Sequence, residues 1–317
     1  MLVNTVCRGG GIGRHKGLKI PRRKLRAGST PAPGTISMFH LIESKEDLNF
    51  LSGELSERGC LAIDTEFKRT SKDNLQLSLI QISDSEEIYI IDCIKIGHLE
   101  MNLSFLSSKE VEKVFHSCRE DVEAIFSWTD EKLNNIFDTQ LAIAFLGGSF
   151  SISYQDIVKE QLGVSINKEE TRSNWIRRPL RSSQLNYAAS DVQFLLDVYF
   201  DQKRMLLESS KFRWLKEDTS YICDKIYHEN NTIPEETFNK QFDKKEELNL
   251  LNKVNDLVLE ISKQHNINPT LFFSKKNQKD FTELSFKYGI NFSLEKLTPW
   301  RRSLLSAPLS SIFTNIL

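Results

Sequence analysis

Three apolar stretches of strand length follow one another between residues 60 and 93, and the first of them contains two carboxylates. The stretches are CLAIDTEF (60–67), NLQLSLIQISD (74–84) and EEIYIIDC (86–93). The second alternates apolar and polar residues and the third is largely apolar, which is typical of half-buried and buried strands. A short turn joins these two stretches and predicts an antiparallel hairpin. A sheet is therefore expected at the centre of this part of the chain.

Helical periodicity alternates with further strand patterns on both sides of these stretches. Leucines recur at helical spacing before residue 60, and VEKVFHS (111–117) and NNIFD (134–138) each predict a short strand followed by a helix. The spacing of apolar residues predicts one long helix from near Ser182 to about Glu208. The pattern predicts an α/β domain over residues 38–210, in which helices pack on a mixed sheet.

Residues 1–37 differ in composition from the rest of the chain. They hold eight of the 42 basic residues, no acidic residue and seven of the fourteen glycines, so we expect disorder. Three explanations compete: a basic nucleic-acid-binding arm, a transit peptide, or an upstream segment that is not translated, with Met38 as the true start. We favour the last. The other 280 residues hold 34 basic and 43 acidic residues, so any polyanion site must be local and must be formed with the help of bound cations.

The C-terminal part, residues 211–317, is predicted to be helical and more polar. Residues 230–247 are typical of a linker, and apolar residues recur at helical spacing after them. No apolar stretch of the chain approaches the roughly 18 residues that a bilayer-spanning helix needs. The five cysteines are scattered without a CxxC pair, which fits reduced thiols better than disulfides or a zinc site. We therefore expect a cytoplasmic protein without a membrane segment.

Two pairs of residues form the centre of a candidate metal site. Asp64 and Glu66 are one residue apart on a predicted strand, which turns both side chains to one face and Thr65 to the other. Tyr187 and Asp191 are spaced i, i+4 on a predicted helix and also share a face. Each pair has an ordinary structural explanation as well: a strand end that meets solvent, or a core tyrosine beside an exposed aspartate.

Asp121 is the fourth carboxylate of the candidate set. It lies in the first turn of a predicted helix, where the helix dipole favours acidic residues in any case. Asp138 precedes a helix after an apolar run, which favours an N-cap role, so we leave it out of the catalytic set. Clustered carboxylates repel one another unless cations lie between them, and hard oxygen ligands suit Mg²⁺ or Mn²⁺. This arrangement is typical of phosphoryl transfer.

Four segments together resemble the exonuclease motifs of ribonuclease D, a family in the DEDDy branch of the 3′→5′ exonucleases. They are DTEF (64–67), FHSCREDVEAIF (115–126), FDTQLA (137–142) and RSNWIRRPLRSSQLNYAASDVQFLL (172–196). The resemblance implies an RNase H-like mixed sheet flanked by helices. The C-terminal region is similar to the small all-helical HRDC domain of that family, best over about residues 246–312. Ribonuclease D commonly carries two such modules, and this chain holds one recognisable copy and a degenerate first.

The resemblance also implies a mechanism. Asp64, Glu66, Asp121 and Asp191 take the positions of the metal-binding carboxylates, and Tyr187 takes the position of the catalytic tyrosine. Two divalent cations, Mg²⁺ or Mn²⁺, would stabilise the attacking and leaving oxygens of an in-line displacement at phosphorus. A free tyrosine has a pKa near 10, so Tyr187 is expected to orient the attacking water. The implied products are 5′-nucleoside monophosphates, released from RNA with a free 3′ end such as a tRNA precursor.

Candidate substrate-binding residues lie beside the catalytic set. Thr65 could contact the terminal nucleotide through its backbone, and Phe67 could stack on it. His116, Trp175 and Arg178 are further candidates, although a core histidine, an anchoring tryptophan and a solvated arginine are equally ordinary explanations.

Two other functions stay open at this point. A DNA exonuclease of the same superfamily would carry the same acidic set, because only a contact to the 2′-hydroxyl separates RNA from DNA. A nucleic-acid-binding protein with an inactive site would lack one of the acids, and all four are present with the tyrosine. We expect a monomer that binds RNA.

Overall fold

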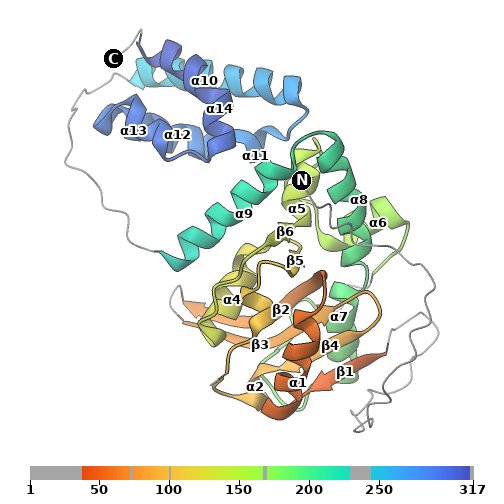
Figure 1. Cartoon of the computed structure of the whole chain (residues 1–317). Helices are drawn as coiled ribbons and strands as arrows, with labels where there is room; N and C mark the ends of the chain where they lie inside the picture. Colours follow the sequence, from red (N-terminus) through yellow and green to blue (C-terminus); the bar gives the residue numbers. More distant parts are fainter. Residues whose placement is uncertain (1–37, 72–73, 100, 167–169, 229–243, 315–317) are drawn as a thin grey trace, which may run out of the picture.

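The computed structural model describes residues 38–71, 74–99, 101–166, 170–228 and 244–314. A six-stranded sheet in the order β1-β4-β3-β2-β5-β6 lies at the centre of its N-terminal part (Figure 1). The strands are β1 (Phe39–Ile42), β2 (Cys60–Ser71), β3 (Asn74–Ser83), β4 (Ile88–Asp92), β5 (Glu112–Phe115) and β6 (Ile136–Asp138). β3 runs antiparallel to β2 and β4, and the other neighbours are parallel. The predicted mixed sheet and the hairpin are confirmed, and β1 is a strand that the sequence patterns did not indicate.

Helices cover both faces of the sheet, because side chains alternate along each strand. Leu61 and Ile63 of β2 join one buried apolar cluster, and Ala62 between them joins the other. The face of Leu61 is covered by α1 (Lys45–Ser56), α2 (Cys93–Ile96), α3 (Ser104–Ser107) and α4 (Arg119–Thr129). The face of Ala62 is covered by α5 (Thr139–Phe145), α6 (Tyr154–Leu162), α7 (Ser182–Gln193) and α8 (Leu195–Glu208). The burial of both faces is the main driving force for this architecture.

The single long helix predicted from Ser182 to Glu208 is wrong, because the chain breaks at Phe194 into α7 and α8. A continuous helix would bond the Phe194 N–H to the Ser190 carbonyl. The hydroxyl of Tyr154 lies between these groups instead: it donates to the Ser190 oxygen at 3.3 Å and accepts from the Phe194 N–H at 3.1 Å. A side chain that enters the hydrogen-bond ladder in this way kinks a helix.

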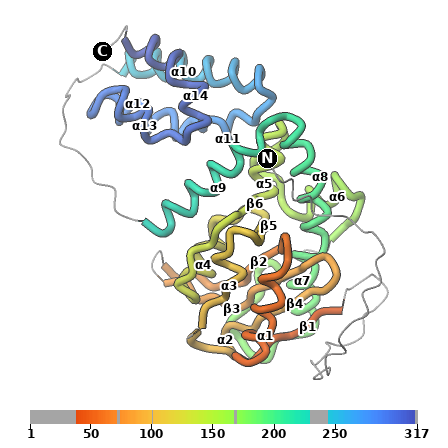
Figure 2. The backbone as a smooth tube through the Cα atoms, viewed as in Figure 1, coloured from red at the N-terminus to blue at the C-terminus, as the bar shows by residue number. Residues whose placement is uncertain are grey.

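The C-terminal part is helical, and α9 connects it to the sheet region (Figure 2). Its helices are α9 (Phe212–Tyr227), α10 (Lys244–His265), α11 (Pro269–Phe273), α12 (Lys275–Tyr288), α13 (Ile290–Glu295) and α14 (Pro299–Thr314). α9 packs on β6 and α4 and also contacts α14. Lys211 reinforces the junction, since its ammonium donates to the carbonyls of Phe145 and Asn266 at 2.8 Å each.

Several predictions concern segments that bear little on the site. The helical character expected after residue 244 is confirmed, whereas the domain division at residues 210 and 211 stays a prediction. Residues 1–37 and most of the predicted linker 230–247 lie outside the described residues, and residues 244–247 already belong to α10. Among the described helices, none has both the length and the hydropathy of a membrane span. The four cysteines in the described ranges are free thiols.

Candidate active site

The far half of β2 carries the first two acids. β2 pairs with β5 only as far as Ala62 and then continues along β3 alone, so the space beside Asp64 and Glu66 is open to helices. The register with β3 shifts between Glu66 and Phe67, which marks a β-bulge. Bulges redirect side chains and are common beside active sites. The strand thereby carries its acids on the stretch where β3 is its only partner in the sheet.

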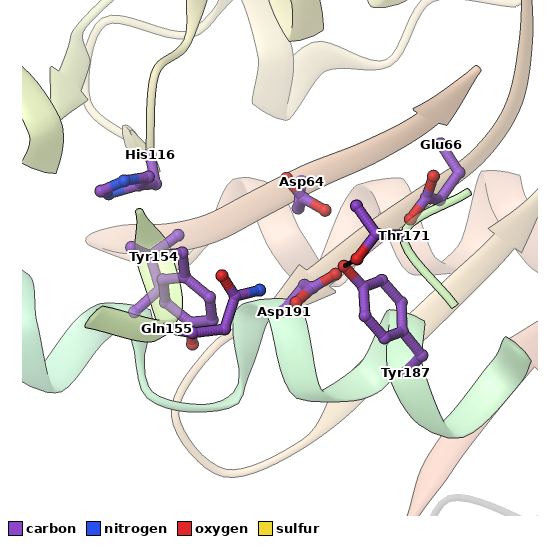
Figure 3. A pocket seen from close by; sticks show the side chains of 9 residues that line it. Asp64, Glu66, His116, Tyr154, Gln155, Thr171, Tyr187 and Asp191 are labelled. Carbon is purple, nitrogen blue, oxygen red and sulfur yellow. Dashed lines mark hydrogen bonds between the residues drawn. The ribbon is translucent and has the colours of Figure 1, made fainter. Parts of the chain in front are cut away.

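Helix α7 brings a third carboxylate to these two. One carboxylate oxygen each of Asp64, Glu66 and Asp191 lies within 4.8 Å of the other two, and Tyr187, one turn before Asp191, lines the same pocket (Figure 3). The i, i+4 spacing places Tyr187 and Asp191 on one face of α7, and the alternation along β2 places Asp64 and Glu66 on one face of the strand. These two faces lie opposite each other, so the side chains come together. The geometry is that of a site able to share a cation among three ligands.

Asp121 comes from α4, the helix that covers the other face of the sheet, and it is not part of this group of three. Thr65, which points away from Asp64 and Glu66, donates its hydroxyl proton to Asp121 Oδ1 at 2.6 Å. The start of α4 is held by Asp138, whose carboxylate accepts from the backbone N–H groups of residues 117 and 118. The same carboxylate caps α5, as the sequence predicted. Asp121 is nevertheless close enough for the charge of Asp64 to act on it.

The electrostatics of the site fit a divalent cation. Burial, with the charge of Asp191 next, raises the pKa of Asp64 well above its usual value. Burial and the charges of the other three acids raise the pKa of Glu66 to about 10. Burial raises the pKa of Asp191 to about 7. Within the described residues, Asp191 Oδ1 is also buried without a hydrogen-bond partner. Carboxylates that resist ionisation and an oxygen without a donor are what a hard cation would satisfy.

Tyr187 keeps its proton in this environment. Burial, followed by the charge of Asp191, raises the pKa of its phenol above the ordinary value of 10. The phenol pairs with the hydroxyl of Thr171 at 3.2 Å, which fixes its position (Figure 3). A protonated phenol can donate a hydrogen bond to a reacting group, and orientation is thus the role that its chemistry supports.

The structure gives the other predicted substrate-binding residues defined protein contacts. Arg178 donates to both oxygens of the Asp92 carboxylate at 2.7 Å, and its guanidinium also bonds to the Trp175 carbonyl. The Trp175 side chain is buried, and its ring centroid lies 6.1 Å from that of Tyr187. These contacts anchor the loop before α7 on the sheet, so the structural explanation fits both residues, and their contact with substrate stays a prediction.

Two other candidates have different surroundings. Both ring nitrogens of His116 have protein partners, the Thr139 hydroxyl and the Ile152 carbonyl, although the residue lines the pocket. Burial lowers the pKa of His116 below its ordinary value. Phe67 is half-buried and packs on the α4 side of the sheet, with the Arg69 guanidinium 5.9 Å from its ring centroid. Stacking of Phe67 on a nucleotide stays a prediction.

Sequence reasoning missed three polar residues of the pocket, Tyr154, Gln155 and Thr171, and also the apolar Leu195. Tyr154 and Gln155 begin α6, and Thr171 precedes α7 by eleven residues. None of them has a charge or a spacing that would indicate a site. They line the pocket because the tertiary fold brings these distant segments next to the acidic residues.

Comparison with known proteins agrees with this geometry. The family model described as 3′-5′ exonuclease matches residues 39–206, more than half of the chain. The chain belongs to the 3′-5′ exonuclease family. The matched segment contains all four acids and the tyrosine, and it ends within α8.

Similar sequences and structures extend this result. Ribonuclease D of Shewanella sp. is 33% identical over 183 residues, which are 58% of this chain and 47% of that protein. Ribonuclease D of Pseudomonas paraeruginosa is 37% identical over 171 residues, 54% of this chain and 45% of that protein. The chain thus spans about half the length of the curated relatives it matches.

Two solved structures show the same fold. Escherichia coli RNase D, an exoribonuclease involved in structured RNA processing, has a TM-score of 0.58 at 22% identity, covering 87% of this chain and 74% of that one. Brucella melitensis NrnC with bound Mg²⁺ has a TM-score of 0.51 at 22% identity, covering 59% and 90%. The predicted RNase H-like fold is confirmed. The first match covers far more than the exonuclease segment, so the C-terminal helices fit an HRDC-like domain.

Proposed function

We propose that this protein is a metal-dependent 3′→5′ exoribonuclease that releases 5′-nucleoside monophosphates. The observation that carries the proposal is the meeting of three carboxylates within 4.8 Å, in a chain of the 3′-5′ exonuclease family. Carboxylates this close together repel one another, which a surface that only binds nucleic acid does not need. A site that holds a cation requires carboxylates at such distances.

Asp64, Glu66 and Asp191 are the residues that would hold a shared cation, and Asp121 is the fourth candidate ligand. Bound Mg²⁺ or Mn²⁺, two ions in our proposal, would neutralise phosphate charge and lower the pKa of a water molecule. The protein itself fixes the positions of these ligands. Asp64 and Glu66 extend from a strand and Asp191 from a helix, and ligands on such rigid elements hold their geometry without further ordering.

Tyr187 is the residue that we assign to the attacking water. Its phenol retains its proton, since burial and the charge of Asp191 oppose ionisation. It can therefore donate a hydrogen bond and hold the water in line with the phosphorus, while the hydroxyl of Thr171 fixes the position of the phenol. Removal of the proton by Tyr187 itself is disfavoured at neutral pH.

We propose RNA with a free 3′ end as the substrate, tRNA precursors in particular. The similarity to ribonuclease D over residues of the catalytic part supports this choice. The HRDC-like helices would supply a second RNA-binding surface at a fixed distance. Arg301 of α14 donates to both carboxylate oxygens of Asp218 in α9, at 2.5 and 2.8 Å, which joins that surface to the catalytic part. We place the activity in the cytoplasm, where free thiols are stable, and expect a monomer.

Digestion of a 5′-labelled RNA that carries a 3′ trailer tests this function. Wild type should remove one nucleotide at a time in Mg²⁺ or Mn²⁺, and EDTA should stop it. Asp64→Ala should be inactive, whereas Glu160→Ala, which alters an exposed acid of α6, should digest normally. Full activity of Asp64→Ala would refute the proposal, and a strong preference for a matched DNA strand would indicate a DNA exonuclease instead.

A further inference from the structure

The neutral polar side chains of the active-site pocket are, with one exception, already hydrogen-bonded to protein. The hydroxyl of Tyr154 bridges α7 and α8, and both ring nitrogens of His116 have partners. The hydroxyls of Thr171 and Tyr187 pair with each other. Gln155 is the exception, because no group in the described part of the chain bonds to its amide. Its donor and its acceptor are both left for a ligand.

The base from which Gln155 extends is rigid. It is the second residue of α6, and Ser153 caps that helix by accepting from the Asp156 N–H at 3.2 Å and donating to the Asp156 carboxylate at 2.6 Å. Tyr154 beside it is buried. Figure 3 shows the Gln155 amide directed toward Asp191, inside the pocket that Asp64 also lines. A fixed backbone and a free amide suit a residue that recognises one group of a bound substrate.

We propose that Gln155 hydrogen-bonds to the 2′-hydroxyl of a nucleotide held at the acidic cluster and thereby selects RNA over DNA. This inference rests on the proposed exonuclease function. A carboxamide has both a donor and an acceptor, and the 2′-hydroxyl is likewise both. The ionised acids of the pocket can only accept, and they would be committed to cations. Gln155 is therefore the pocket side chain whose chemistry matches the one group that separates RNA from DNA.

The expected discrimination is moderate. A substrate without the hydroxyl leaves the amide unpaired, which is how a hydrogen-bonding site rejects an analogue. Gln155 is half-buried, so water compensates part of that loss. One neutral hydrogen bond corresponds to a factor of roughly 2 to 10 in kcat/KM or in the dissociation constant.

Single-atom changes in the substrate, combined with changes at position 155, test the proposal. The substrates are one RNA oligonucleotide with a 3′-hydroxyl, and the same oligonucleotide with a 2′-deoxy sugar at the last or the second-last position. The proteins are wild type, Gln155→Ala, Gln155→Met, which keeps the chain length, and the α6 control Glu160→Ala. The first cleavage is timed in Mg²⁺, and binding is measured by fluorescence anisotropy in Ca²⁺, so a readout exists that does not depend on turnover.

In wild type and Glu160→Ala, removal of the 2′-hydroxyl at one of the two positions should weaken binding and slow cleavage by roughly 2- to 10-fold. Both Gln155 variants should bind and cleave the RNA more weakly than wild type by about the same factor. They should bind and cleave the RNA and the deoxy-substituted oligonucleotides equally well, as a double-mutant cycle requires for a direct contact. Equal discrimination in wild type and the Gln155 variants would overturn the proposal, and so would a wild type that binds all three oligonucleotides alike. If wild type cleaves none of them, the exonuclease function fails, while the anisotropy ratios still decide the role of Gln155.

Discussion

Replacement of Glu66 by Gln should stabilise the metal-free protein at neutral and alkaline pH. Burial and the charges of Asp64, Asp191 and Asp121 raise the pKa of Glu66 from 4.5 to about 10. The unfolded chain releases this proton near pH 4.5, whereas the folded protein retains it until about pH 10. Folding stability therefore falls as pH rises through this window, because the unfolded state is the one that gains from ionisation. Glutamine cannot ionise and removes that dependence.

The size of this change in folding stability follows from the shift in the pKa of Glu66. Each pH unit within the window costs about 1.36 kcal/mol for one group, so the fall from pH 6 to pH 8 would reach about 2.7 kcal/mol at most. Glu66 is partly exposed to the pocket, and the screening by solvent reduces this figure. We expect Glu66→Gln to exceed wild type by about 1–2 kcal/mol in free energy of unfolding at pH 8 and to match it closely at pH 5.

Urea unfolding in EDTA at pH 5, 6, 7 and 8 measures this difference. Glu160→Gln, which changes an exposed acid on α6, is the control and should follow wild type at every pH. Saturating Mn²⁺ should stabilise wild type more than Glu66→Gln at pH 8, because the variant has lost one anionic ligand. A variant that is less stable than wild type at pH 8 in EDTA would refute the reasoning, since the carboxylates would then not repel one another.

Three further substitutions test separate contacts. Tyr187→Phe should lower kcat by about 100-fold with little change in KM, and kinetics that leave kcat unchanged would remove the phenol from the mechanism. Thr65→Val should reduce the free energy of unfolding by about 1–3 kcal/mol, because Asp121 loses its buried hydrogen-bond donor; a neutral effect in urea unfolding would contradict that contact. Tyr154→Phe should cost about 1–2 kcal/mol and reduce activity, since the break after Asp191 loses its bridging hydroxyl; unchanged stability and turnover would show that the break does not depend on it.

Local rules explain what the sequence could predict. Alternation along a strand and the i, i+4 spacing of a helix act over a few residues, so they indicated that Asp64 and Glu66 share a face, as do Tyr187 and Asp191. The apolar runs also predicted the β3–β4 hairpin, because neighbouring strands with a short connection pair with each other. The structure brings the carboxylates of three of these four residues together, with the phenol of the fourth lining the same pocket.

Contacts between distant segments could not be predicted in the same way. The break at Phe194 is caused by a hydroxyl forty residues earlier in the chain, and no helix-breaking residue stands near it. The partner of Asp121 is Thr65, 56 residues away, whose side chain the sequence turned away from the acids without indicating what it contacts. Arg178 lies near the site in sequence, yet its charge is paired with Asp92 on β4. Gln155 carried no signal at all, because a glutamine in a first helical turn is ordinary.

Mass spectrometry of the products from a defined RNA with a 3′-hydroxyl tests the central claim most directly. Asp64, Glu66 and Asp191 would hold the cations, and attack on the phosphorus by a water that Tyr187 orients would leave the phosphate on the departing nucleotide. Wild type in Mn²⁺ should therefore yield 5′-nucleoside monophosphates that accumulate from the 3′ end, and Asp191→Asn should yield none. Release of 3′-monophosphates or of internal fragments, or the same products from Asp191→Asn, would contradict the account.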